Sequence, residues 1–166
     1  MGIGYRFTCS VCGLQYHISF GLGFLFPQVY RDTVTEILEG LYGDTWKNTW
    51  IKYEGNIAVN AENYLFQCDQ CGNWHQKKDM SLYRKKIKLK PVDKSEWFYR
   101  RKESEKDFVT ERDLKKDYYL IERYVHKCEK CGEEMTRIDA KTYDGIEMSC
   151  PMCGKKNPVE MPYMWD

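Results

Sequence analysis

All eight cysteines of the chain lie in four copies of one short string, Cys-x-x-Cys-Gly. Two cysteines three positions apart can direct both sulfur atoms at one metal ion. The Gly that follows allows a positive φ, so that amide N–H groups can point at the thiolates. Two strings supply the four thiolates of one tetrahedral site, so the count predicts two structural Zn²⁺ ions as cofactors. The predicted metal ligands are Cys9, Cys12, Cys68, Cys71, Cys128, Cys131, Cys150 and Cys153.

The four strings, numbered first to fourth in chain order, can pair in more than one way. We favour sequential pairing, first with second and third with fourth, because chain connections tend to be short. The 18 residues 132–149 between the last two strings also match the usual spacing of a two-string zinc site. A nested arrangement joins first with fourth and second with third, and strands at 82–89 and 118–126 that pair as a hairpin would produce it. A cross-brace joins first with third and second with fourth.

The fourth string, Cys150-Pro-Met-Cys153-Gly154, resembles the Cys-Pro-x-Cys-Gly turn of the zinc-ribbon and rubredoxin-like families. The resemblance is strongest over residues 124–155 and implies β-hairpins that end in metal-binding turns. Thiolates bind both zinc and iron. Rubredoxins usually carry an aromatic residue directly after the first string, whereas Glu133 follows the third string here. We therefore expect zinc, with a rubredoxin-like iron protein as the redox alternative.

The cysteine pattern and the absence of an apolar leader point to a reducing compartment. Paired cysteines also form disulfides in secreted proteins. The sequence begins Met-Gly-Ile-Gly-Tyr-Arg-Phe, without an apolar signal segment, and the apolar stretch 18–27 is too short to span a membrane. Each cysteine has a partner three positions away, which suits a metal better than a disulfide framework. We expect a cytoplasmic protein without a membrane partner.

Short strands lead into the strings, and two insertions separate them. Tyr5 and Phe7 lie on one face of a predicted strand before the first string, and similar approaches precede the second and third strings. These features predict an α+β protein with two small zinc-ribbon units. We expect a first ribbon over 1–90 with a helical insertion at about 27–63, a charged linker over 91–117, and a second ribbon over 118–166.

The helical insertion is predicted from apolar spacing. Apolar residues recur at i, i+3, i+4 and i+7 along a predicted helix that follows Pro27; they are Val34, Ile37, Leu38 and Leu41. Asp44 is the expected cap of a second helix that carries Trp46 and Trp50, and 57–63 is expected to add a short helical turn. We expect these helices to cover the first ribbon.

A local excess of basic residues lies between the second and third strings. It comprises Lys77, Lys78, Arg84, Lys85, Lys86, Lys88 and Lys90, against one acidic residue, Asp79. Basic side chains interleaved with rings suit nucleic acid, because the charges release counterions from phosphates and the rings stack on bases. The alternative is a Lys-rich edge strand that resists aggregation. The whole chain is nearly neutral, with 26 Lys and Arg against 25 Asp and Glu, and favours neither.

No catalytic motif accompanies the cysteines. The chain has no His-Glu-x-x-His, no P-loop and no Gly-x-Ser-x-Gly, and a four-thiolate site leaves no position for substrate. Three histidines near the strings (His17, His75, His126) are expected to pack or to donate N–H to sulfur. We therefore predict a non-enzymatic, zinc-stabilised protein that binds a protein partner, as an adaptor or inhibitor. The candidate contact residues are Phe24, Phe26, Trp46, Trp50, Trp97 and Phe98. Nucleic-acid binding through 77–90 is the alternative.

Overall fold

The computed structural model describes residues 2–21, 23–86, 107–138 and 143–165. The chain divides into two compact units, and neither is one continuous stretch. The cysteine unit comprises Met1–Phe26, Ala61–Met80 and Arg123–Asp166. The helical unit comprises Pro27–Asn60 and Ser81–Glu122. The architecture is α+β, and the chain crosses between the units several times instead of forming the three consecutive segments expected from the sequence.

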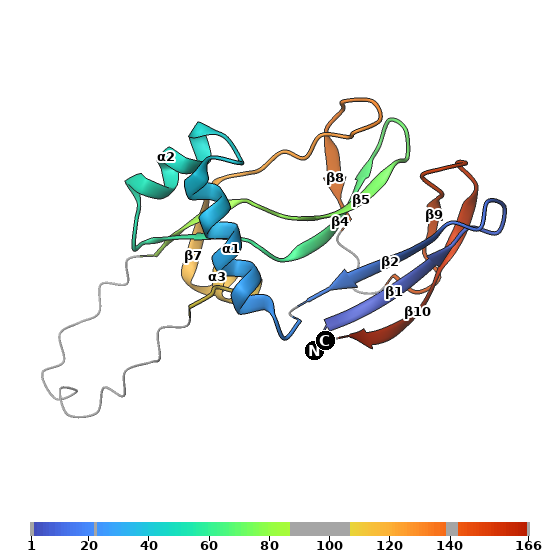
Figure 1. The fold of residues 1–166 in the computed structure, drawn as a ribbon, viewed down its shortest axis with the longest axis horizontal. Coiled ribbons are helices and arrows are strands. Elements are labelled where there is room, and N and C mark those ends of the chain that lie inside the picture. The colour runs from blue at the N-terminus through green and yellow to red at the C-terminus, as the bar shows by residue number, and fades with distance from the viewer. Residues whose placement is uncertain (1, 22, 87–106, 139–142, 166) are drawn as a thin grey trace, which may run out of the picture. The chain divides into compact units, whose positions relative to one another are not determined.

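Two antiparallel sheets form the cysteine unit (Figure 1). The larger has the strand order β2-β1-β10-β9, with bounds β1 Gly2–Thr8, β2 Gln15–Phe20, β9 Glu147–Ser149 and β10 Lys156–Trp165. The smaller has the order β5-β4-β8, with bounds β4 Asn63–Cys68, β5 Trp74–Lys78 and β8 Met135–Arg137. The first, second and fourth strings form the turns of the hairpins β1–β2, β4–β5 and β9–β10. The third lies between the bridged residues Lys127 and Glu134, just before β8.

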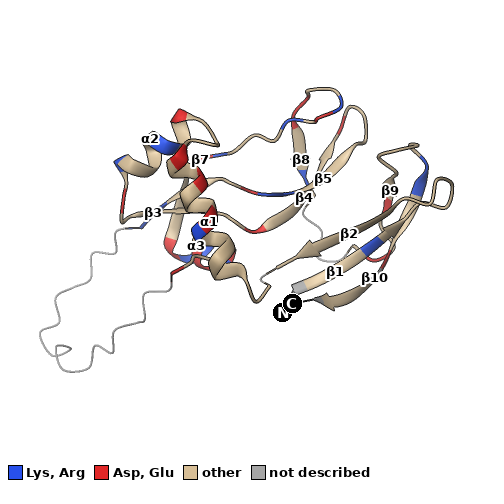
Figure 2. Cartoon of the chain, in the orientation of Figure 1, with Lys and Arg blue, Asp and Glu red and all other residues tan. Residues whose placement is uncertain are grey.

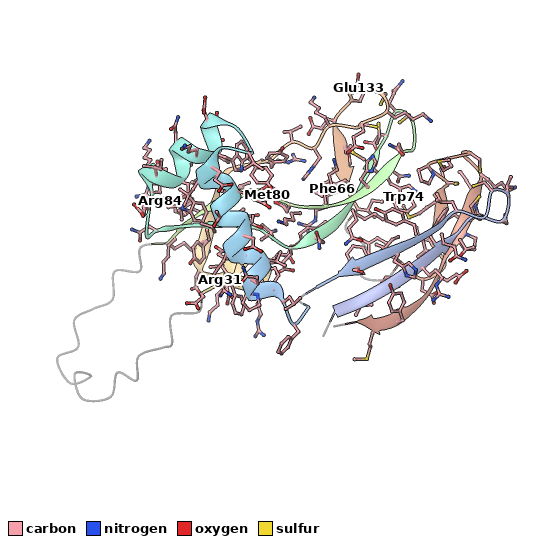
Figure 3. The ribbon with its side chains drawn as sticks, viewed as in Figure 1. Arg31, Phe66, Trp74, Met80, Arg84 and Glu133 are labelled. Atoms are coloured by element: carbon pink, nitrogen blue, oxygen red, sulfur yellow. The ribbon has the colours of Figure 1, made fainter. Side chains whose placement is uncertain are left out.

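Side chains of β5 hold the two sheets of the cysteine unit together. Trp74 is buried, its ring lies 5.4 Å from that of Phe7, and its indole N–H donates to the Ser149 carbonyl at 2.7 Å (Figure 3). Two positions along β5, the Gln76 amide accepts from the backbone N–H of Ser19 and donates to its carbonyl, at 2.7 and 2.8 Å. The side chain of Gln76 therefore occupies backbone groups on the outer edge of β2, which would otherwise be open to another strand.

Three helices and one antiparallel sheet form the described part of the helical unit. The helices are α1 Phe26–Glu39, α2 Asp44–Lys52 and α3 Glu111–Asp117, and the sheet order is β3-β6-β7, with bounds Ile57–Val59, Leu82–Lys85 and Tyr118–Glu122. Tyr30 and Ile37 of α1 are buried, as are Val59, Leu82 and Leu114. At the start of α3, Thr110 and Asp113 form a capping box, in which each side chain bonds the backbone N–H of the other.

The buried face of α1 differs from the one predicted. Tyr30, Thr33 and Ile37 are buried, while Leu38 and Leu41 are exposed. Thr33 can face inward because its hydroxyl donates to the Val29 carbonyl, one turn earlier, at 2.7 Å. Of the predicted apolar stripe only Ile37 is buried, because the inward face continues through Tyr30 and Thr33, which the apolar spacing did not include.

Three other local predictions differ from the structure. Asp44 is the first residue of α2 and Gly43 is its N-cap, with φ 91° and no side-chain cap bond. Residues 57–59 form strand β3 instead of a helical turn. The two helices, which were expected to cover the first ribbon, belong together with this strand to the helical unit. Of the strand predicted over 82–89, β6 comprises Leu82–Lys85, residue 86 is not in a strand, and residues 87–89 lie outside the described residues.

Candidate metal centres

The four Cys-x-x-Cys-Gly strings adopt one and the same turn. In each, the Gly N–H donates to the carbonyl of the first Cys, and the N–H of that Cys donates to the carbonyl of the residue after the Gly, at 2.8–3.0 Å. The four glycines have φ between 70° and 78°. A Cβ at Gly13, Gly132 or Gly154 would meet nothing within 4 Å, so these positions need glycine for its backbone conformation and not for space.

The strings pair in the nested arrangement. The terminal cluster consists of Cys9, Cys12, Cys150 and Cys153, and the central cluster of Cys68, Cys71, Cys128 and Cys131. Within each cluster the four Sγ atoms lie within 4.8 Å of one another. The favoured sequential pairing is therefore wrong. Strand pairing explains why: β1 pairs with β10, which joins the two ends of the chain, while β6 pairs with β7 and β4 with β8, which joins the second and third strings.

The sulfur geometry fits one metal ion in each cluster. Between the two strings of the terminal cluster, the Sγ atoms of Cys9 and Cys153 lie 3.5 Å apart. In the central cluster those of Cys68 and Cys131 lie 3.4 Å apart. A disulfide requires about 2.05 Å, whereas a Zn–S bond of about 2.3 Å in a tetrahedron places sulfurs about 3.8 Å apart. The clusters are thus suited to metal ions and do not have disulfide geometry.

N–H groups of the turns converge on the first cysteine of a string. The backbone N–H groups of Cys12 and Val11 hold the pKa of Cys9 down at about 6, against the effect of burial. Burial alone would raise the pKa of Cys128, but N–H donors from Cys131 and Lys130 outweigh it and lower this pKa to about 6. The first cysteine of each of these strings is therefore prepared to be a thiolate.

The second cysteine of the first string and that of the third string show the opposite tendency. One N–H, from Leu14, acts to lower the pKa of Cys12, but burial and the neighbouring thiolates raise it to about 12. The pKa of Cys131 is raised to about 12 by its sulfur neighbours and by burial, against the lowering effect of the Glu133 N–H. Like charges this close cannot all ionise without compensation. Each cluster is therefore a site where a cation is needed before all four thiols become thiolates.

Each cluster also has one buried asparagine that donates to a sulfur. Asn157 Nδ2 lies 3.6 Å from Cys9 Sγ, and Asn73 Nδ2 lies 3.7 Å from Cys128 Sγ. The Asn157 oxygen accepts from both the backbone N–H and the hydroxyl of Ser10, at 3.0 and 2.7 Å, which fixes the orientation of its amide. Sequence reasoning missed both residues. The signal was a short amide side chain within three residues of the Gly of a string.

Of the two roles expected for the histidines, packing is found for His126, and in the described part of the chain the contacts of the three histidines do not include a sulfur. His126 is buried against the Phe66 ring and bonds the Asp79 carbonyl at 3.3 Å, and burial lowers its pKa. His17 bonds the Tyr163 hydroxyl at 3.1 Å. His75 reaches the central cluster only through Asn73, 3.0 Å from its Nε2. In the described part of the chain, asparagine and backbone amides supply the N–H groups that sequence reasoning assigned to histidine.

The basic residues of 77–90 do not form one strand. Lys77 and Lys78 end β5 in the cysteine unit, whereas Arg84 and Lys85 end β6 in the helical unit. Lys77 forms an ion pair with Glu129 at 2.7 Å. Elsewhere, Arg84 lies over the Tyr53 ring and Lys86 Nζ donates to the Lys116 carbonyl. Lys88 and Lys90 lie outside the described residues. Residues of both charge signs occur in each of the two units (Figure 2).

The predicted partner-contact residues have different environments. Phe24 is 85% exposed, whereas Phe26 is 6% exposed and belongs to the core, so it presents no contact surface. Trp46 and Trp50 are half-buried on α2, and Trp97 and Phe98 lie outside the described residues. The exposed apolar residues that sequence reasoning missed include Val11 and Met152, each inside a Cys-x-x-Cys string.

No protein family, curated protein or solved structure matches the chain. Among the helices of the described residues, none has the length and apolar run that crossing a membrane requires.

Proposed function

We propose that this chain is a zinc-stabilised, non-enzymatic binding protein that acts through protein–protein contacts, as an adaptor or inhibitor, on two zinc ribbons. One observation carries the proposal: all eight cysteines belong to two four-sulfur clusters. A metal with four thiolate ligands has no open position for water or substrate, and the thiolate charge makes it a poor Lewis acid. The metals therefore stabilise the fold, and the activity resides in the surface that they hold.

Zinc is the proposed metal in both clusters. Zn²⁺ has no redox chemistry and tolerates four thiolates in a tetrahedron, which is the usual composition of structural sites. Iron in the same ligand set would make a redox centre. Growth with both metals supplied, followed by elemental analysis of the purified protein, separates the two. A colourless protein with two Zn²⁺ per chain is expected, and a coloured protein with stoichiometric iron would contradict the assignment.

A protein partner is favoured over nucleic acid by the surface of the described residues. The basic stretch that motivated the nucleic-acid alternative is divided between two units, and Lys77 is neutralised by Glu129. Large apolar side chains are exposed instead, among them Phe24, Val11 and Met152. Such side chains gain free energy when another protein covers them, and they make no hydrogen bonds to phosphates or base edges.

Native mass spectrometry of the protein purified from its own cells tests the proposal. The expected species carries two Zn²⁺ and a bound protein, and the partner is released when a chelator removes the metal, because the binding surface depends on the metal. Association with nucleic acid alone, lost at high salt, would contradict the protein-binding function. A protein partner that stays bound after complete metal removal would show that the metal-held surface is not the binding surface.

A further inference from the structure

The four metal-binding turns have the same backbone conformation, but the side chains between the cysteines differ in polarity between the two clusters. Between their cysteines, the two turns of the central cluster carry Asp69-Gln70 and Glu129-Lys130. Those of the terminal cluster carry Ser10-Val11 and Pro151-Met152. Since the turn geometry is shared, the metal site does not require either composition. The apolar residues of the terminal cluster therefore need an explanation other than metal binding.

Each turn of the central cluster has one acidic residue that is engaged within the chain. Asp69 accepts from the Thr136 hydroxyl at 2.9 Å, and Glu129 forms its ion pair with Lys77 at 2.7 Å. Val11 and Met152 are instead 67% and 76% exposed, and neither belongs to the core of the cysteine unit. The two turns that carry them surround one cluster, whose sulfurs all lie within 4.8 Å of one another. They therefore belong to one small surface, the terminal tip.

Two lysines adjoin the terminal tip. Lys155 follows the Gly of the fourth string, and Lys156 begins β10; both are exposed. The backbone of Lys155 is part of the turn, because its carbonyl accepts from the N–H of Cys150 at 2.8 Å. Within the described part of the chain, neither side chain has an ion-pair partner, in contrast to Lys77 beside the central cluster. The surface thus combines aliphatic side chains with unpaired positive charge.

We propose that the terminal tip, formed by Val11 and Met152 and flanked by Lys155 and Lys156, binds a short segment of a partner protein that places an apolar side chain beside acidic residues. This inference rests on the proposed protein-binding function and names its surface and the chemistry of its partner. An apolar side chain of the partner covers Val11 and Met152, and its carboxylates face the two lysines. Nucleic acid fits less well, since aliphatic side chains cannot stack on bases as rings do. The small surface indicates a weak, transient contact.

Selection of short random peptides by phage display on the zinc-loaded protein tests the inference. Met152→Lys is the informative variant, because Lys130 occupies the same turn position in the central cluster and shows that the turn accepts lysine. Gln70→Lys is the matched control, with the same new side chain at the equivalent position of the other cluster. Both variants are expected to retain two Zn²⁺ and the thermal unfolding temperature of the parent protein.

The selected peptides are expected to combine an apolar side chain with Asp or Glu. Their Kd is expected to rise at least about tenfold for Met152→Lys, to change little for Gln70→Lys, and to rise for the double variant Lys155→Glu, Lys156→Glu. Equal binding to the Met152→Lys variant and the parent, or selection of basic peptides, would overturn the inference. So would a single-stranded oligonucleotide that binds through the lysines independently of Met152.

The test separates this inference from the proposed function. Peptides or a native partner that bind equally to the parent protein and to Met152→Lys place the contact elsewhere on the chain, so that the inference fails and the protein-binding function stands. A native mass spectrum with nucleic acid as the sole partner contradicts both.

Discussion

The two cysteine clusters share their turns and differ in what surrounds them. The terminal cluster adjoins a core of ten buried residues, of which Cys9 and Cys150 are themselves ligands. This core also contains Phe7 and Ile18 of the four-stranded sheet and Trp74 of the three-stranded sheet. The central cluster adjoins a core of four buried residues, of which Cys68 and Cys128 are themselves ligands. A small apolar core contributes little stability, and a structural metal then supplies what burial cannot. The central cluster should therefore depend on its metal more than the terminal cluster does.

Replacing one ligand in each cluster tests this difference in metal dependence with the largest expected effect. Cys128→Ser should remove the central metal ion and unfold β8 and the third string, because metal binding of about 10 kcal/mol or more is coupled to folding and these segments add only Met135 and Cys128 to a core. Cys9→Ser should remove the terminal Zn²⁺ but leave slow hydrogen exchange in β1 and β10, which keep their apolar core. Elemental analysis and hydrogen exchange measure both effects. Equal loss of protection in the two variants would show that the cores do not differ in their need for metal.

Removing the amide donors perturbs the same clusters without removing a ligand. Asn157→Ala should weaken zinc binding more than Asn73→Ala, because Asn157 also accepts two hydrogen bonds from Ser10. Groups that hydrogen-bond metal ligands typically affect metal affinity by about 10- to 100-fold. Competition with a chromogenic chelator gives the two affinities. A larger effect at Asn73 would indicate that His75, which bonds this amide, has the greater influence on its cluster.

The local chemistry of the clusters could be predicted from the sequence, but the sequence left their pairing open, with the nested arrangement as an alternative to the favoured sequential one. The spacing of Cys9 and Cys12, with Gly13 behind them, specifies a turn that is complete within a few residues. Which turns meet depends instead on strands far apart in sequence, such as β1 and β10, whose register pairs Gly2 with Trp165. Strand periodicity indicates a face but not a partner. The tendency to short connections favours neighbours, and here β6 and β7 overrule it.

The difference between local sequence signals and long-range contacts also explains the errors in the helical region. Apolar spacing located α1 but not its buried face, because Thr33 satisfies its hydroxyl within its own helix and can be buried. The division into units could not be predicted either, since residues 27–60 belong to one unit with the described residues of 81–122, although residues 61–80 of the other unit separate them in the sequence. Local sequence determines turns and helices, whereas the assignment of segments to units is a property of tertiary contacts.

Acidification tests whether the two clusters are electrostatically alike. The pKa of Cys9 and of Cys128 is lowered from 9.0 to about 6. A thiolate with a depressed pKa contributes stability that is present above the ordinary pKa and is lost as pH falls through the folded value. Zinc affinity of both clusters should therefore fall steeply, and together, as the pH drops below about 6, since protons then compete for these sulfurs. Zinc release at clearly different pH values would show that the surroundings, and not the shared turn, set the acid sensitivity.

A substitution in the helical unit serves as a metal-independent control for stability, and its expected effect is the smallest. Thr110→Ala removes the hydroxyl that accepts from the Asp113 N–H and breaks the capping box of α3. Loss of an N-cap costs about 1 kcal/mol, so the midpoint of chemical unfolding should fall modestly. The zinc stoichiometry and the rate of metal release to a chelator should stay unchanged, because Thr110 lies outside the unit that holds both clusters. Faster metal release from Thr110→Ala would mean that the helical unit helps to hold the clusters, and the stability of the two regions could then no longer be compared as separate quantities.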